Sequence, residues 1–403
     1  MFPKLRFKEF DENWKEVTLK NCITSIDSGW SPQCESYPAN SSEWGVLKTT
    51  SVDWSGFNSS FNKKLPLELT PRKEIEVKPL DILVTRAGPT ERVGVVSVVP
   101  HSVRSKLMIS DKLIRLKSNE ENNPLFLGIS LSSVKCQNQL QSKTSGLAKS
   151  QTNISQKILG EVLLKLPSKE EQTKIASFLS AVDEKISQLT KKHELLSQYK
   201  QGMMQKLFSQ QVRFKADDKS EFGEWEEKEL KDIAEINPKS KKLPESFIYI
   251  DLESVEKGQL LLQKNIELQD APSRAQRLLA KGDVLFQMVR PYQQNNYYFN
   301  LSGEYVASTG YAQIRTKLDS KFIYYALHEK TFLDEVMNRC TGTSYPAINS
   351  SDLSSIEILI PCLEEQTKIA NFLSAIDQKI EVVAQQIEQA KQWKKGLLQQ
   401  MFV

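Results

Sequence analysis

The sequence predicts a mixed α/β fold with an internal pseudo-two-fold repeat: two globular domains separated by two long helices that form an antiparallel coiled coil. The first observation behind this prediction is a repeated segment. The stretch PSKEEQTKIASFLSAVDEKI, which begins at Pro167, returns as PCLEEQTKIANFLSAIDQKI at Pro361. Between Glu170 and Ile186, 14 of 17 positions are identical to their counterparts. Coincidence does not produce such agreement, so the chain contains a duplication.

The second observation is the spacing of apolar residues in both copies. Steps of three and four predict long helices that each carry a narrow apolar seam. At ~1.5 Å per residue, the first helix would extend about 58 Å from residue 170 to 208. That is too long and too one-sided for a core helix, so the other copy is its expected partner, and two unrelated surface helices are the alternative. The seam comprises Ile175, Phe178, Leu179, Val182, Ile186 and Leu189, then Ile369, Phe372, Leu373, Ile376, Ile380, Val383 and Ile387.

The start of the first helix has the pattern of a capping box. Ser168 is expected to accept a hydrogen bond from the backbone N–H of Glu171, while the Glu171 side chain reaches back toward the cap. In the second copy Cys362 replaces the capping serine, which weakens the cap. Glu365 remains there, and its charge favours the positive end of the helix.

Length and composition set broad limits. A chain of 403 residues exceeds what one core usually serves, which predicts two domains. The net charge of +4 permits nucleic-acid binding without requiring it. No apolar run approaches the ~18 residues of a membrane span, and the start lacks a secretory apolar region, so a cytoplasmic protein with no membrane contact is expected. Five cysteines, with no C-x-x-C pair, argue against a zinc site and a disulfide framework.

The two halves of the chain begin and end alike. Each starts with a lead segment that ends in tryptophan, Leu5–Trp14 in the first half and Val212–Trp225 in the second. Each has a turn that feeds a buried strand, and each ends in an alternating strand before its long helix. The expected organisation is a first globular domain (1–166), a helical spacer (167–210), a second globular domain (211–360) and a second helical region (361–403).

The middle parts of the halves differ. Residues 29–51 have no evident counterpart in the second half, and residues 290–298 have none in the first, which has residues 86–92 instead. The scaffold is shared while the loops are not. This pattern suits a protein that reads two different targets at two fixed positions.

The repeated EEQTKIA starts under Leu166-Pro167 and Ile360-Pro361, together with the globular-helix-globular-helix order, resemble the specificity subunits of type I restriction-modification systems. The resemblance covers essentially the whole chain. It implies two target recognition domains, each reading half of a split, asymmetric site in double-stranded DNA. It also implies an antiparallel helical coil that docks two modification (methyltransferase) subunits, and restriction subunits joined through the assembled complex. S-adenosylmethionine, ATP and magnesium would then be bound by the partner subunits. The departure at Cys362 affects only the helix start.

No catalytic or metal site is predicted from the sequence. It lacks a P-loop, a G-x-G-x-x-G after a strand and an H-E-x-x-H pair. His101, His193 and His328 are scattered, and His193 has the spacing of a half-buried seam residue. The Glu76-Val-Lys78 triplet has a spacing seen in nucleases, but such triplets arise freely in a chain that is 26% charged.

Candidate DNA contacts are chosen by side-chain chemistry, because Arg and Lys suit guanine, Gln and Asn suit adenine, and Ser, Thr and Lys suit phosphates. A solvated polar loop or a plain turn is the alternative for each of them. Glycine would allow close backbone approach in the loops 144–146 and 341–345. The second-half candidates are Gln287, Arg290, Tyr292, Gln293, Gln294, Asn295, Asn296, Thr341, Thr343 and Ser344. The first-half candidates are Lys48, Thr49, Thr50, Arg86, Arg92, Lys143, Thr144 and Lys149.

Apolar residues near the helix ends exceed what one seam can bury, which predicts a partner-binding surface. Closure of the coil itself is the alternative. These residues are Leu195, Tyr199, Met203, Met204, Leu207, Trp393, Leu397, Leu398 and Met401.

The sequence is compatible with three functions but does not favour them equally. A non-catalytic DNA-specificity subunit is favoured. A self-sufficient DNA methyltransferase or nuclease is disfavoured by the missing motifs, and a pure assembly scaffold would not need two dissimilar loop sets on one frame.

Overall fold

The computed structural model describes residues 3–144, 152–240 and 242–402. Two compact units are formed: unit 1 comprises Met1–Gln188 and Gln386–Val403, and unit 2 comprises Leu189–Gln385. Each unit therefore contains one globular part, the beginning of the long helix that follows it, and the end of the other long helix. The sequence suggested consecutive segments instead, because sequence order does not reveal which distant helix end packs on which domain.

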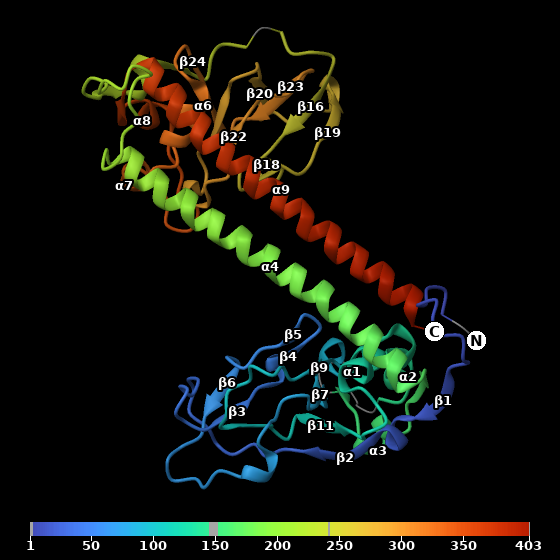
Figure 1. The fold of residues 1–403 in the computed structure, drawn as a ribbon. Coiled ribbons are helices and arrows are strands. Elements are labelled where there is room, and N and C mark those ends of the chain that lie inside the picture. Colours follow the sequence, from blue (N-terminus) through green and yellow to red (C-terminus); the bar gives the residue numbers. More distant parts are fainter. Residues whose placement is uncertain (1–2, 145–151, 241, 403) are drawn as a thin grey trace. The chain divides into compact units, whose positions relative to one another are not determined.

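Unit 1 is built on an antiparallel sheet with the strand order β2-β11-β7-β9. A second, smaller sheet has the order β10-β3-β6, and helices α1 and α2 follow the last strand of the larger sheet (Figure 1). The bounds are β2 Ile23–Ser28, β3 Gly45–Leu47, β6 Asn62–Lys64, β7 Ile82–Thr85, β9 Val96–Val98, β10 Leu107–Met108, β11 Leu113–Ser118, α1 Pro124–Ser132 and α2 Val134–Ser142.

Unit 2 repeats this plan with the sheet β15-β24-β21-β22, and its second sheet has the order β19-β16-β23-β20. Helices α6 and α7 follow β24 as α1 and α2 follow β11. The bounds are β15 Ala234–Ile236, β16 Ser246–Ile250, β19 Lys264–Glu267, β20 Ala275–Leu278, β21 Val284–Gln287, β22 Tyr297–Tyr298, β23 Tyr305–Ser308, β24 Tyr311–Thr316, α6 Ser320–Ala326 and α7 Lys330–Asn338.

The predicted buried strands β7 and β21 are confirmed, and their burial has a simple cause. Ile82 and Val84 enter the core that includes α1, while Leu83 faces the opposite core beneath the smaller sheet. In unit 2, Val284 and Phe286 likewise face the helices, and Leu285 faces the second core. A strand covered on both faces has an unbroken apolar sequence.

The predicted alternating strands before the long helices are also confirmed. β13 (Leu163–Leu166) pairs antiparallel with β1 (Lys15–Thr18), and β25 (Glu357–Ile360) pairs antiparallel with β14 (Glu226–Glu229). The strand that begins each globular part therefore lies against the strand that ends it. This pairing brings each lead segment close to the start of the helix that follows the same domain.

The two predicted long helices are α4 (Lys169–Phe208) and α9 (Leu363–Met401). The Ser168 hydroxyl accepts from the Glu171 backbone N–H at 3.4 Å, as expected for the cap. The Glu171 side chain does not return to the cap. It lies 1% exposed and accepts two hydrogen bonds from the Arg6 guanidinium, each at 2.7 Å, and one from the Trp14 indole at 3.3 Å.

The second half repeats this arrangement. Glu365 is fully buried and accepts from the Arg213 guanidinium at 3.1 and 2.6 Å and from the Trp225 indole at 3.1 Å. Charge-assisted, bidentate hydrogen bonds of this kind are among the strongest in proteins. The matching arginine and tryptophan of each lead segment therefore fix the first turn of each long helix.

The neighbouring glutamine of the repeated motif ties the same turn to the domain. Gln172 donates to the Pro167 carbonyl at 3.1 Å and accepts from the Asn123 N–H at 2.9 Å. Gln366 donates to the Pro361 carbonyl at 2.8 Å and accepts from the Asp319 N–H at 3.2 Å. Asn123 and Asp319 are the N-caps of α1 and α6, so one side chain joins two helix starts. The repeated residues thus have a structural role.

Within each unit, the start of one long helix lies beside the end of the other. In unit 1 the Phe178 and Trp393 rings make an edge contact at 5.9 Å, and Lys394 pairs with Asp183 at 2.5 Å. The antiparallel pairing expected from the sequence is therefore confirmed, as Figure 1 shows for α4 and α9.

Unit 2 contains the same contacts 194 positions away in each helix. Tyr199 and Phe372 make the ring contact at 6.5 Å, and Lys200 pairs with Asp377 at 2.6 Å. The Lys200 ammonium also lies over the Tyr325 ring of α6, at 5.2 Å from the ring centroid. The duplication thus extends to individual contacts along both helices.

Three further expectations concern the cysteines, membrane-spanning helices and His193. All five cysteines are free thiols. In the described ranges, no helix combines the length and apolarity needed to cross a membrane. His193 is half-buried on α4, as its spacing predicted.

The buried carboxylates lead to a stability prediction. Arg6→Ala leaves the Glu171 carboxylate buried without its charged partner, so urea unfolding should show unit 1 destabilised by about 2–3 kcal/mol. Arg213→Ala should have a similar effect on unit 2. Lys174→Ala, which removes the exposed pair with Glu9, is the control and should change stability by less than about 1 kcal/mol. Equal effects of Arg6→Ala and the control would contradict this role.

Candidate nucleic-acid interface

The densest group of predicted DNA contacts follows strand β21 in unit 2. Gln287, the last residue of that strand, is buried, and its side chain braces the loop. It donates to the Gln293 side chain at 2.9 Å and accepts from the Asn295 N–H at 3.0 Å, while its own N–H donates to Asn296 Oδ1 at 2.8 Å. Gln287 and Asn296 are therefore interior residues that shape the loop. Both are buried in the described structure, and direct contact with DNA stays a prediction for them.

The loop itself holds two side chains on a strained backbone. Arg290 and Gln294 flank the 3₁₀ turn Pro291–Gln293, and both adopt left-handed conformations, with φ of 54° and 52°. Tyr292, at the middle of the turn, is exposed. Asn295 is occupied, because its side-chain oxygen accepts from the Lys257 N–H at 3.0 Å. The predicted residues left at the surface of this loop are Arg290, Tyr292, Gln293 and Gln294.

The structure brings the second predicted loop against this one. The Arg290 N–H donates to the Pro346 carbonyl at 2.7 Å, and the Ile348 N–H donates to the Met288 carbonyl at 3.1 Å. Thr341 and Ala347 exchange two backbone hydrogen bonds of 2.9 Å, which closes the loop 341–347. Thr341, Thr343 and Ser344 are exposed on it. Loops more than 40 residues apart in sequence thus form one surface, here named the unit 2 loop surface (288–296 and 341–347).

Unit 1 joins its corresponding loops in the same way. The Ile154 N–H donates to the Arg86 carbonyl at 2.9 Å, which matches the bond between Ile348 and Met288. Strands β8 (Ala87–Gly88) and β12 (Thr152–Asn153) pair next to it, and the hydroxyls of Thr90 and Thr152 are 2.7 Å apart. The equivalent unit 1 loop surface therefore comprises 86–94 and 152–154, and Arg86 lies half-buried at its base.

Arg92 has a different role from the one expected. Its guanidinium pairs with the Asp53 carboxylate at 2.5 Å and donates to the Val52 carbonyl at 2.8 Å. The Arg92 bond lowers the pKa of Asp53, so the ion pair persists at neutral pH. Arg92 thereby anchors the loop that carries Lys48, Thr49 and Thr50, and its contact with DNA stays a prediction. Those three residues are half-buried or exposed beside it.

The remaining unit 1 candidates lie at the end of α2. Lys143 is exposed, and the Thr144 hydroxyl donates to the Gln141 carbonyl at 2.9 Å. Lys149 and Gly146 lie outside the described residues. The Glu76-Val-Lys78 triplet is an ion pair within the fold, and Glu76 also accepts from the Lys106 N–H at 2.7 Å.

The predicted partner-binding residues divide by burial. Leu195, Tyr199 and Trp393 are more than 50% exposed on the long helices, and Met203, Met204 and Leu398 are half-buried. Leu207, Leu397 and Met401 are buried in the cores of the two units. These last three residues close the domains in which they lie, and the partner contact stays a prediction.

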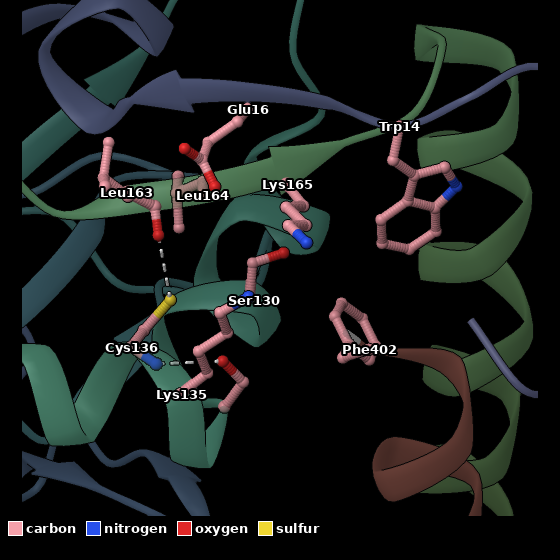
Figure 2. A pocket seen from close by; sticks show the side chains of 10 residues that line it. Trp14, Glu16, Ser130, Lys135, Cys136, Leu163, Leu164, Lys165 and Phe402 are labelled. Atoms are coloured by element: carbon pink, nitrogen blue, oxygen red, sulfur yellow. Dashed lines mark hydrogen bonds between the residues drawn. The ribbon is translucent and has the colours of Figure 1, made fainter. Parts of the chain in front are cut away.

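A small cavity lies where the end of α9 meets unit 1 (Figure 2). It has a volume of about 20 Å³, which is room for one water molecule. Cys136 lies on its wall, and burial raises the pKa of this thiol, which keeps it protonated and unreactive at neutral pH. Among the residues that the structure describes, no cluster of three or more His, Cys, Asp or Glu side chains could hold a metal.

The comparisons with known proteins agree with this architecture. A family model described as the type I restriction modification DNA specificity domain matches residues 12–197 and 223–392. Each match covers one globular part and most of the helix that follows it. The chain belongs to this family. It is a non-catalytic specificity subunit of a type I restriction-modification system, with two DNA specificity domains.

Relatives and solved structures support the assignment. The specificity subunit of the type I restriction enzyme EcoEI from Escherichia coli is 40% identical over 171 residues, which is 42% of this chain and 29% of that one. The MjaVIII specificity subunit from Methanocaldococcus jannaschii is 28% identical over 345 residues, covering 81% and 79% of the two chains. A type I S subunit structure from M. genitalium matches with a TM-score of 0.64 at 17% identity, covering 100% and 99% of the chains, which supports the fold.

Three residues that position the loops of the specificity subunit are not among the sites predicted from its sequence. Tyr345 lies in the predicted loop 341–345, and its ring packs against the Arg290 guanidinium. Asp53 and His328 are not predicted as site residues either, because their partners Arg92 and Asn296 are distant in sequence. The sequence signal that could have identified Tyr345 is its aromatic ring beside the polar residues of the same loop.

His328 supports the unit 2 loop surface from below. Its Nδ1 lies 2.7 Å from the Tyr324 carbonyl and therefore donates to it, so Nε2 can accept from the Asn296 amide at 3.4 Å. Burial lowers the pKa of His328 below its ordinary value of 6.5. The folded chain thus holds this imidazole neutral.

This neutrality predicts a pH dependence of stability. Below about pH 6.5 the unfolded chain gains a proton on His328 that the folded chain does not, so the free energy of unfolding falls as pH decreases through the depressed pKa. The contribution is at most about 1.4 kcal/mol per pH unit. His328→Gln should lose less stability between pH 7.5 and 5.5 than the unchanged chain does, as measured by urea unfolding. The same loss in both proteins would exclude this contribution.

Proposed function

We propose that each globular domain of this specificity subunit reads one half of a bipartite site in double-stranded DNA, through the unit 1 and unit 2 loop surfaces. The observation that supports this most is a shared frame with different loops. The backbone bonds from Ile154 to Arg86 and from Ile348 to Met288 are equivalent. The loops that these bonds join nevertheless carry different side chains in the two units. A common frame with different polar side chains suits one DNA duplex and two base sequences.

The long helices have two proposed roles in the same complex. They set the number of unread base pairs between the half-sites, and they dock two modification subunits. Exposed apolar residues on helices that already have an apolar seam support the docking role. Restriction subunits would join through the assembled complex, in the cytoplasm. The partner subunits would bind S-adenosylmethionine, ATP and magnesium and carry out the chemistry on DNA.

The independence of the two domains is testable by exchange. Replacing residues 15–160 with the equivalent segment of another specificity subunit should change one half-site and leave the other unchanged. The segment begins with β1 and ends before β13, so the replacement retains Arg6, Trp14 and the start of α4. Methylome sequencing of cells that carry the hybrid subunit and its modification subunits gives both half-sites directly. A change in both half-sites would show that the domains do not read independently.

The docking role predicts a selective loss of assembly. Leu195→Asp places a charge on an exposed apolar position of α4, so it should abolish co-purification of a modification subunit while the unfolding temperature stays near that of the unchanged chain. Val134→Asp is the matched control, because Val134 is 73% exposed on α2 of unit 1. Leu397→Asp should unfold unit 1 instead, since it buries a charge in the core. Normal co-purification with Leu195→Asp would contradict the docking role.

A further inference from the structure

The Arg290 side chain lies in an unusual setting on the unit 2 loop surface. Its guanidinium lies over the ring of Tyr345, with 4.3 Å between the guanidinium carbon and the ring centroid. Tyr345 is 63% exposed, so the stack lies at the surface. Within the part of the chain that the structure describes, the Arg290 guanidinium makes no ion pair or hydrogen bond. Its planar set of donors is therefore available to a ligand.

The backbone holds this arrangement at a cost in strain. Arg290 has φ 54° and ψ 53°, and it precedes Pro291. A left-handed conformation is unfavourable for a residue with a Cβ, and a residue before proline is further restricted. The bond from the Arg290 N–H to the Pro346 carbonyl, at 2.7 Å, fixes this conformation. Strain of this kind persists where the surrounding structure imposes it, and it is concentrated at functional sites.

Several polar side chains near Arg290 are already occupied. Gln287, Asn295 and Asn296 bond to the loop or to adjacent strands. By contrast, Arg92 on the unit 1 loop surface is neutralised by Asp53. Arg290 is thus positioned by an aromatic face and a backbone bond rather than by a carboxylate, and it keeps its charge and its donors.

We propose that Arg290 is a specificity-determining residue that recognises a guanine in the half-site of unit 2. The proposal rests on the proposed function and adds the base. Guanine presents O6 and N7 as two acceptors in the major groove, and an arginine fork donates to both of them. Tyr345 is the positioning residue, because its ring holds the guanidinium plane in one orientation and reduces the entropy lost on binding.

A phosphate contact is the competing role for a free arginine, and substitutions separate the two. Lysine retains the positive charge but lacks the planar fork and stacks less well. Arg290→Lys would preserve a phosphate contact but weaken the recognition of guanine, because a lysine offers no planar fork for the Tyr345 ring to orient. Arg290→Gly removes the side chain and tolerates positive φ, so it relieves the strain.

The test is methylome sequencing of the complete complex with the unchanged subunit, Arg290→Gly, Arg290→Lys, Tyr345→Leu and Tyr345→Phe. The unchanged complex should require a guanine in the unit 2 half-site. Both Arg290 variants should accept other bases at that position, with discrimination reduced about 5- to 150-fold, and the other half-site should stay the same. Tyr345→Leu should relax the same position, and Tyr345→Phe should restore it. Arg290→Gly should unfold at a temperature no lower than the unchanged chain.

Arg274, an exposed arginine before β20 in the same unit, is the matched control, and Arg274→Ala should leave the motif unchanged. The proposal is overturned if the unit 2 half-site contains no required guanine. It is also overturned if the Arg290 variants reduce methylation uniformly with an unchanged motif, which indicates a phosphate contact, or if Arg290→Gly lowers the unfolding temperature, which indicates a structural role. A different result, no bipartite motif with the unchanged subunit, would reject the proposed function itself.

Discussion

The buried pairs between Glu171 and Arg6, and between Glu365 and Arg213, are the constraint on which the architecture depends. Each pair ties the first turn of a long helix to the lead segment of its own domain, with a tryptophan indole as a further donor. A buried carboxylate without a partner is strongly unfavourable. The helix therefore leaves each domain at a defined point, which is what a subunit with two reading surfaces requires.

The same constraint explains why the repeated motif is rich in polar residues although its neighbours form an apolar seam. The second glutamate and the glutamine of EEQTKIA are buried and hydrogen-bonded, and the following Ile175 and Ala176 enter the domain core. The motif is thus a junction between helix and domain. Loop residues are not part of this junction, so they can differ between halves without disturbing the frame.

On the loop surfaces, polar residues of one chemical type divide into buried braces and surface residues. In unit 2, Gln287 and Asn296 are buried and brace the loop. His328, which follows α6, is hydrogen-bonded to Asn296. In unit 1, Arg92 braces a loop through Asp53. These residues have the side-chain types expected of base readers, so type alone could not distinguish them. Burial and partners show instead that, among the described residues, the Arg290 guanidinium stacks on the exposed Tyr345 ring and makes no ion pair.

The sequence by itself determined the duplication, both long helices, the strands on either side of each domain and the family. These features follow from local periodicity and repeated residues, which sequence displays directly. The tertiary structure decided which helix end closes which domain, so that Leu397 and Met401 belong to the core of unit 1. It also decided which polar side chains are braces and which are free. Such facts depend on contacts between residues far apart in the chain, and sequence spacing carries no record of them.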